Sequence, residues 1–96
     1  MTAREQVRLL RHEILQAAEA NGARRIRLFG SAARGHETGA SDVDLLVALE
    51  PGRTLLDLAR LEARLERLLS RPVDVVPESG LREPFRSAVL RDAVDV

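Results

Sequence analysis

The chain has 96 residues, 45% hydrophobic and 31% charged, and its 15 basic and 15 acidic side chains cancel. This length suits a single domain over residues 1–96, and without a signal peptide or an apolar run near the roughly 18 residues that cross a membrane, we expect a cytoplasmic protein. Balanced charge also disfavours a nucleic-acid partner, because non-specific binding to phosphates needs a basic surface.

The first predicted element is a helix over residues 2–21. Residues 2–5, Thr-Ala-Arg-Glu, form a capping-box pattern, and apolar residues then recur three and four positions apart. Residues 21–22, Asn-Gly, favour a left-handed helix end, and residues 25–29 alternate as a half-buried strand does. The glycines and serines of residues 30–41 predict a turn-rich connection with one short helical turn.

A second strand is predicted over residues 42–48, and Pro51-Gly52 ends it. Thr54 begins a second helix, because leucines follow it at steps of three and four. These inward positions are Leu55, Leu58, Leu61, Leu65, Leu68 and Leu69. Pro72 ends this helix.

The last predicted elements are a short strand over residues 73–76 and a helix that begins near Pro84, with Phe85, Val89 and Leu90 facing inward. The order helix, strand, strand, helix, strand, helix predicts an α/β (α+β) domain. We expect a small mixed β-sheet of three to four strands flanked by helices. Residues 92–96 leave the fourth strand undecided.

Two aspartates, Asp42 and Asp44, interrupt an otherwise apolar strand. The period-2 alternation of a strand points both to one face, about 6.5–7 Å apart along the backbone. Carboxylates at this spacing can reach two cations roughly 3.5–4 Å apart, and oxygen-only ligands suit Mg²⁺. The alternative is that each aspartate simply faces solvent from a half-exposed strand.

A third aspartate, Asp74, interrupts residues 73–76 in the same way, and a neighbouring strand could set it beside the first pair. Three clustered carboxylates repel one another unless cations neutralise them, which favours a bound metal. Gly30-Ser31 ends the preceding strand. Glycine lets the backbone approach an anion, and the amides and hydroxyl that follow can bind phosphate oxygens. The sequence therefore predicts a phosphate cradle beside a metal site.

The composition also removes whole classes of chemistry. The chain contains neither cysteine nor lysine, and all of its cations are arginines. A thiolate zinc site, a cysteine nucleophile, a covalent lysyl-nucleotide intermediate and a P-loop lysine are all excluded.

Gly30-Ser31, ten intervening residues and Asp42-Val43-Asp44 together resemble the signature of the DNA polymerase beta-like nucleotidyltransferase superfamily. Residues 28–35 and 41–47 are similar to the minimal nucleotidyltransferases (MNT), which act as antitoxins beside HEPN-domain toxins. The resemblance implies a mixed sheet with flanking helices. It also implies binding of Mg-ATP and transfer of AMP to a hydroxyl with release of pyrophosphate.

The resemblance further implies a role for each matching residue. Asp42 and Asp44 would hold two Mg²⁺ ions, and Asp74 would complete the metal site and help to deprotonate the acceptor. Gly30 and Ser31 would hold the outer phosphates of ATP. Arg34 would contact the triphosphate, the alternative being a structural pairing with a loop carbonyl. The histidines, His12 and His36, are expected at the surface.

The acceptor implied by the resemblance is a tyrosine of a HEPN-type toxin, with which the chain would form a complex. This sequence has no tyrosine, so it cannot modify itself on a phenol. The rival hypothesis is a catalytically weak or inactive binding module that neutralises the toxin by contact alone. Transfer to an antibiotic or to an RNA end would need a further domain or a basic surface, and neither is evident.

Overall fold

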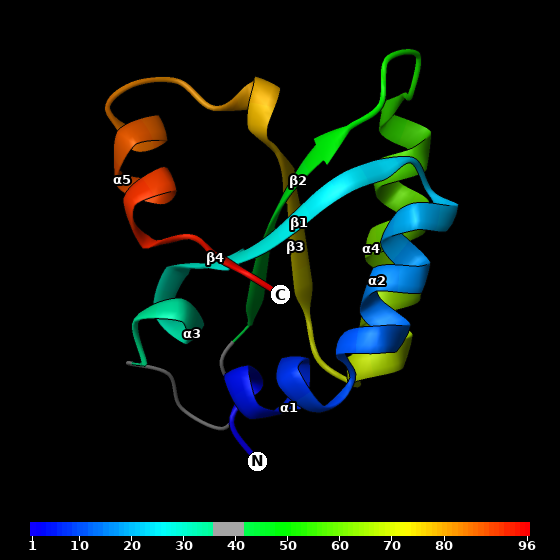
Figure 1. Cartoon of the computed structure of the whole chain (residues 1–96), viewed down its shortest axis with the longest axis vertical. Coiled ribbons are helices and arrows are strands. Elements are labelled where there is room, and N and C mark those ends of the chain that lie inside the picture. The colour runs from blue at the N-terminus through cyan, green and yellow to red at the C-terminus, as the bar shows by residue number, and fades with distance from the viewer. Residues whose placement is uncertain (36–41) are drawn as a thin grey trace.

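A computed structural model describes residues 1–35 and 42–96, in which a four-stranded sheet has the order β3-β2-β1-β4 (Figure 1). The strands are β1 (Ala23–Phe29), β2 (Val43–Leu49), β3 (Val73–Pro77) and β4 (Val94–Asp95). β1 is antiparallel to both β2 and β4, whereas β2 and β3 are parallel. The predicted mixed sheet is thus confirmed, and the undecided C-terminal residues supply its fourth strand.

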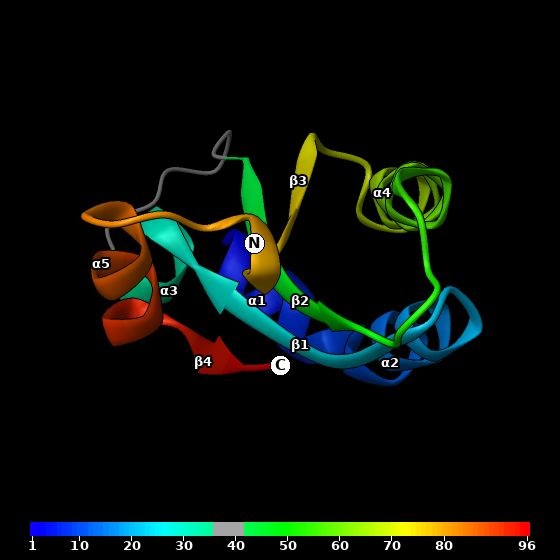
Figure 2. The same cartoon turned by 90° about the horizontal axis from the view of Figure 1, so that it is seen from above.

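Two helices, α2 (Arg11–Ala20) and α4 (Leu55–Leu69), cover one face of the sheet and contribute buried residues to the hydrophobic core. α2 packs on β1, α4 packs on β3, and the two helices contact each other (Figure 2). Alternate residues of β2, Val43, Leu45 and Val47, are fully buried in the same hydrophobic cluster as the α4 leucines. Alternation then places Asp44 on the opposite face of the sheet.

The predicted single helix over residues 2–21 is in fact two helices, α1 (Ala3–Leu9) and α2. The capping box is confirmed, because Thr2 Oγ1 accepts from the Glu5 backbone N–H while Glu5 Oε1 accepts from the Thr2 N–H. Leu10, with φ −100° and ψ 19°, separates the two helices. The break lets α1 contact α3 (Gly30–Arg34), the segment after β1, while α2 packs on the sheet. The helical spacing of Val7 and Ile14 continues across the break, so the sequence pattern does not reveal it.

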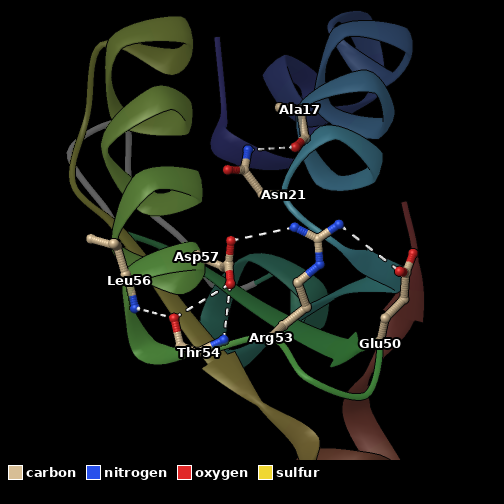
Figure 3. A network of polar contacts seen from close by, with 7 residues as sticks. All are labelled: Ala17, Asn21, Glu50, Arg53, Thr54, Leu56 and Asp57. Atoms are coloured by element: carbon tan, nitrogen blue, oxygen red, sulfur yellow. Dashed lines mark hydrogen bonds and ion pairs between the residues drawn. The ribbon is translucent and has the colours of Figure 1, made fainter.

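The N-terminus of α4 is fixed by a second capping box (Figure 3). The Leu56 N–H donates to Thr54 Oγ1, and the Thr54 N–H donates to Asp57 Oδ2. Arg53 forms ion pairs with both Asp57 and Glu50 (Figure 3). The predicted start of this helix at Thr54 is therefore confirmed.

Farther along α4, two glutamates cover the outer edge of the sheet. Glu66 Oε2 accepts from the Val73 N–H at 3.3 Å, and Glu62 Oε2 accepts from the Val75 N–H at 3.0 Å. β3 is an edge strand, and its outward amides would otherwise be open to pairing with another chain. α4 thus holds the strand that carries Asp74.

Three short elements complete the described chain: α3 (Gly30–Arg34), the 3-10 helix η1 (Glu78–Gly80) and α5 (Phe85–Asp92). η1 and α5 contain no buried residue. None of the helices in residues 1–35 and 42–96 has the length and apolarity of a membrane span.

Two residues predicted to face inward are exposed, Leu55 by 80% and Phe85 by 71%. Leu55 lies seven residues, or about two helical turns, before Glu62, so the two side chains lie on the same face of α4. This face borders the one that packs on the core. Phe85 belongs to α5, in which Val89 and Leu90 are only half-buried. Apolar spacing marked both positions correctly as helical, but it does not show which side of a helix the rest of the fold covers.

Candidate active site

The parallel pairing of β2 with β3 places two of the predicted carboxylates side by side. Asp44 and Asp74 are Cα partners in the register of the two strands. Their neighbours Val43 and Val73 are buried on the helix-covered face, so both aspartates lie on the opposite face. On the other side of β2, the antiparallel pairing with β1 aligns Phe29, the last residue of β1, with Asp44. The predicted approach of Asp74 to Asp44 is therefore confirmed.

The third carboxylate, Asp42, directly precedes β2 and is exposed. It acts on Asp44 through its charge. Partial burial is the main cause that raises the pKa of Asp44, and the negative charges of Asp74 and then Asp42 raise it further. The positive charge of Arg34 acts in the opposite direction. The four predicted charged residues thus belong to one electrostatic cluster.

Gly30 brings the backbone against this cluster. Its φ is +74°, in the left-handed region that favours glycine, and a Cβ at this position would collide with Asp44 Oδ2. Ser31 follows in the first turn of α3 and is half-buried. Because β1 ends one residue earlier, the turn from β1 into α3 passes beside Asp44. Figure 1 shows α3 following directly on the end of β1.

The carboxylates suit a hard cation by their chemistry. Asp42, Asp44 and Asp74 offer only oxygen donors, which are the ligands that Mg²⁺ prefers. A divalent cation would also relieve the repulsion that raises the pKa of Asp44. In residues 1–35 and 42–96, however, no three acidic or histidine side chains already converge closely enough to enclose an ion. The metal-binding role of the aspartates therefore stays a prediction.

Arg34 lies in the last turn of α3 and forms an ion pair with Asp92 of α5, with 3.1 Å between Nη1 and Oδ2. A groove between α3 and α5 is lined by Phe29, Gly30, Arg34, Ala88, Val89 and Asp92. Among the described residues, the partner of Arg34 is thus the Asp92 carboxylate. The loop carbonyl considered from the sequence belongs to a loop whose residues 36–41 lie outside the described part of the chain, so that alternative stays open. Nothing in the sequence pointed to Asp92, because the pair joins residues 58 positions apart.

A second ion pair on this face also escaped the sequence analysis. Arg27 Nη2 lies 2.6 Å from Glu78 Oε1, and the two side chains are only 10% and 26% exposed. Residues 25–29 were predicted to alternate as a half-buried strand, yet Arg27 is buried like its neighbours Ile26 and Leu28. The ion pair explains the departure, since it neutralises a guanidinium that η1 covers.

The histidines are not part of the described site. His12 is exposed on α2, as predicted for a surface residue. His36 and Ser41, which belong to the loop predicted between the phosphate cradle and Asp42, lie outside the described residues.

This combination of a glycine-serine turn and paired carboxylates agrees with the comparison to protein families. The sequence profile of the nucleotidyltransferase domain matches residues 11–95. The chain belongs to this family. Its activity class is therefore nucleotidyl transfer, and its substrate is a nucleotide. The match spans the Gly30-Ser31 turn and all three aspartates.

Individual proteins and solved structures that resemble this chain give a more specific comparison. A Thermococcus cleftensis protein named protein adenylyltransferase MntA is 44% identical over 75 residues, which cover 78% of this chain and 76% of that protein. A solved structure named for a minimal nucleotidyltransferase is 49% identical and superposes with a TM-score of 0.88, covering 100% of this chain and 97% of that one. The nucleotidyltransferase fold expected from the resemblance is thus confirmed.

A more distant structure shows the same fold. It is the crystal structure of a toxin-antitoxin with AMP-PNP, 22% identical, with a TM-score of 0.75 and coverage of 88% of this chain and 69% of the other. At this identity the likeness extends to the fold alone.

Proposed function

We propose that this chain transfers AMP from Mg-ATP to a tyrosine hydroxyl of a HEPN-type toxin and thereby acts as the antitoxin of the pair. The observation that carries the proposal is the alignment of Asp44 with Asp74 in adjacent strands, with Gly30 packed against Asp44. Two printed names support it: one relative is named a protein adenylyltransferase, and a structure of the same fold is named a toxin-antitoxin with AMP-PNP.

The side chains of the cluster take separate roles in this proposal. Asp42, Asp44 and Asp74 would hold two Mg²⁺ ions, while Ser31 and the backbone at Gly30 would bind the outer phosphates. Arg34 adds a planar guanidinium beside the triphosphate. Bound Mg²⁺ ions would stabilise the charge on the attacking and leaving oxygens of an in-line displacement.

The reaction forms one bond and breaks one. The acceptor hydroxyl oxygen bonds to the α-phosphorus of ATP, and the bond from this phosphorus to the bridging oxygen of the β-phosphate breaks. Pyrophosphate leaves with the bonding electron pair, and the hydroxyl proton passes to Asp74. The product is a phosphodiester that joins AMP to the tyrosine.

The acceptor is assigned to a partner because this chain contains no tyrosine. AMP on a toxin side chain adds negative charge and bulk. In a ribonuclease this would oppose binding of the RNA phosphates, so modification and neutralisation would occur together.

The test is to incubate this protein with the neighbouring HEPN-type gene product and Mg-ATP. Modified residues are mapped by mass spectrometry, and ribonuclease activity is followed in parallel. We expect one or more AMP groups on the partner and a loss of ribonuclease activity. Asp42→Asn, which removes a proposed metal ligand, should abolish the modification. An unmodified and fully active partner, or transfer to a small molecule or RNA end instead, would refute the proposal.

The second candidate is a module that neutralises the toxin by contact alone. The Asp42→Asn variant separates the two functions. If the variant and the wild-type protein inhibit the ribonuclease equally, and neither modifies it, binding alone is the function.

A further inference from the structure

Arg34 needs a partner to hold its side chain in one place. It is the last residue of the five-residue helix α3, and its side chain is 49% exposed. A helix this short is marginal by itself, and an exposed arginine samples many rotamers. The ion pair with Asp92, at 3.1 Å, therefore restricts a side chain that the local structure leaves free.

Asp92 is poorly explained by the helix that contains it. It is the last residue of α5, where the negative end of the helix dipole disfavours an acid and favours a cation such as the adjacent Arg91. α5 also has no fully buried residue, and its Val89 and Leu90 are only half-buried. The contact with Arg34 gives the acid a role that helix stability does not.

The ion pair also lies beside the predicted nucleotide site. Arg34 and Asp92 line the groove between α3 and α5 together with Gly30, whose Cα faces Asp44. Within the described part of the chain, Asp92 accepts only from Nη1 of Arg34. The guanidinium keeps further N–H donors, which suffice for a forked contact with a phosphate.

We propose that Asp92 is a positioning residue, which holds the Arg34 guanidinium beside the triphosphate through their ion pair. The inference rests on the proposed function, in which Arg34 contacts the phosphates. Asp92 itself touches neither nucleotide nor metal. It pre-organises the donor fork and couples the placement of α5 to that of the nucleotide.

The experiment measures binding of Mg-ATP and of AMP by calorimetry. Asp92→Asn should weaken Mg-ATP binding about tenfold, the lower end of the effect of losing the hydrogen-bond partner that orients a metal ligand. AMP has no outer phosphates, so its affinity should change little. Asp92→Glu retains a carboxylate and should recover part of the affinity for Mg-ATP.

The matched control is Asp95→Asn. This substitution breaks the ion pair between Asp95 of β4 and Arg25. The pair is 3.0 Å long and, like the pair of Arg34 with Asp92, it is exposed. This control should bind Mg-ATP like the wild-type protein. In an Arg34→Ala background, Asp92→Asn should have no further effect, because Asp92 acts through Arg34.

The outcomes separate the two proposals. Failure of the wild-type protein to bind Mg-ATP would refute the proposed function, and the role of Asp92 with it. Wild-type binding with unchanged or tighter binding by Asp92→Asn would overturn the positioning role alone. An equal loss for Mg-ATP and AMP, or an undiminished loss in the Arg34→Ala background, would show that Asp92 acts through the general structure. Thermal melting of each variant identifies any that has unfolded, and Asp92→Glu then provides the comparison.

Discussion

Asp44 has an electrostatically unfavourable environment and a proposed role in catalysis. Its pKa is raised from the ordinary value of 3.8, first by burial and then by Asp74 and Asp42, so the folded state binds its proton more tightly than the unfolded state does. The free energy of unfolding should therefore fall as the pH rises from about 4 through the raised pKa.

Asp44→Asn removes this ionisation, so the variant should be more stable than the wild-type protein at neutral pH while losing nucleotidyl transfer by orders of magnitude. Urea unfolding in EDTA from about pH 3.5 to about pH 7, a range that begins near the ordinary pKa of a carboxylate, measures the stability of both proteins. Turnover of labelled ATP measures nucleotidyl transfer. Asp95→Asn is the control of opposite sign, because its hydrogen bond with Arg25 lowers the pKa of Asp95. Reduced stability of Asp44→Asn at neutral pH would contradict this account.

Gly30 is the residue at which backbone geometry and the site coincide. Gly30→Ala should destabilise the fold by about 1–2 kcal/mol, the cost of a left-handed conformation for an L-residue, and should also displace Asp44 and reduce transfer. Gly52→Ala is the matched control, since Gly52 has φ +87° but no atom near its added Cβ. We expect similar destabilisation with full activity. Equal activity of both variants would show that the contact of Gly30 with Asp44 is unimportant.

At the scale of elements, the cap of α4 stabilises the helix that holds β3. Thr54→Ala removes the hydroxyl that accepts from the Leu56 N–H and should cost about 1 kcal/mol of unfolding free energy, measured by urea titration. Ser87→Ala is the control, because the Ser87 hydroxyl donates only to exposed Glu83 among the described contacts. An equal, negligible effect of both substitutions would indicate that the cap adds no stability.

The other half of this cap predicts a pH dependence. Asp57 accepts from the Thr54 backbone N–H, and this hydrogen bond lowers the pKa of Asp57 from 3.8. The contribution of Asp57 to stability is therefore present above the ordinary pKa and is lost as the pH falls through the lowered value. Its sign is opposite to that of Asp44.

At the scale of the whole molecule, a bound nucleotide should stabilise the fold by mass action. Mg-ATP at one hundred times its Kd should add about 2.7 kcal/mol to the free energy of unfolding. Ser31→Ala should reduce this ligand-dependent shift in melting temperature more than it changes melting without ligand, because it deletes one hydroxyl from the phosphate cradle. If Mg-ATP raises the melting temperature of Ser31→Ala as much as that of the wild-type protein, Ser31 does not bind the phosphates.

The elements were predictable where local signals act alone. The capping box at Thr2 and the leucine spacing after Thr54 identified two helix starts correctly, because caps and 3.6-residue periodicity depend on neighbours in sequence. The break at Leu10 and the exposure of Phe85 were not predictable. The first depends on how α1 docks against α3, and the second on how α5 docks against α3 and β1, and a local helix sequence encodes neither contact.

By itself, the sequence determined the mixed sheet and the cluster of candidate residues, because period-2 alternation puts Asp42 and Asp44 on one face and Gly30 marks the turn beside them. Only the tertiary structure decided the rest. The register of β2 with β3 aligned Asp74 with Asp44, and the return of α5 beside α3 paired Asp92 with Arg34. Asp44 and Asp74 are 30 positions apart in the sequence, and Arg34 and Asp92 are 58 apart. Strand pairing and helix docking fix such contacts, since no local spacing rule reaches that far along the chain.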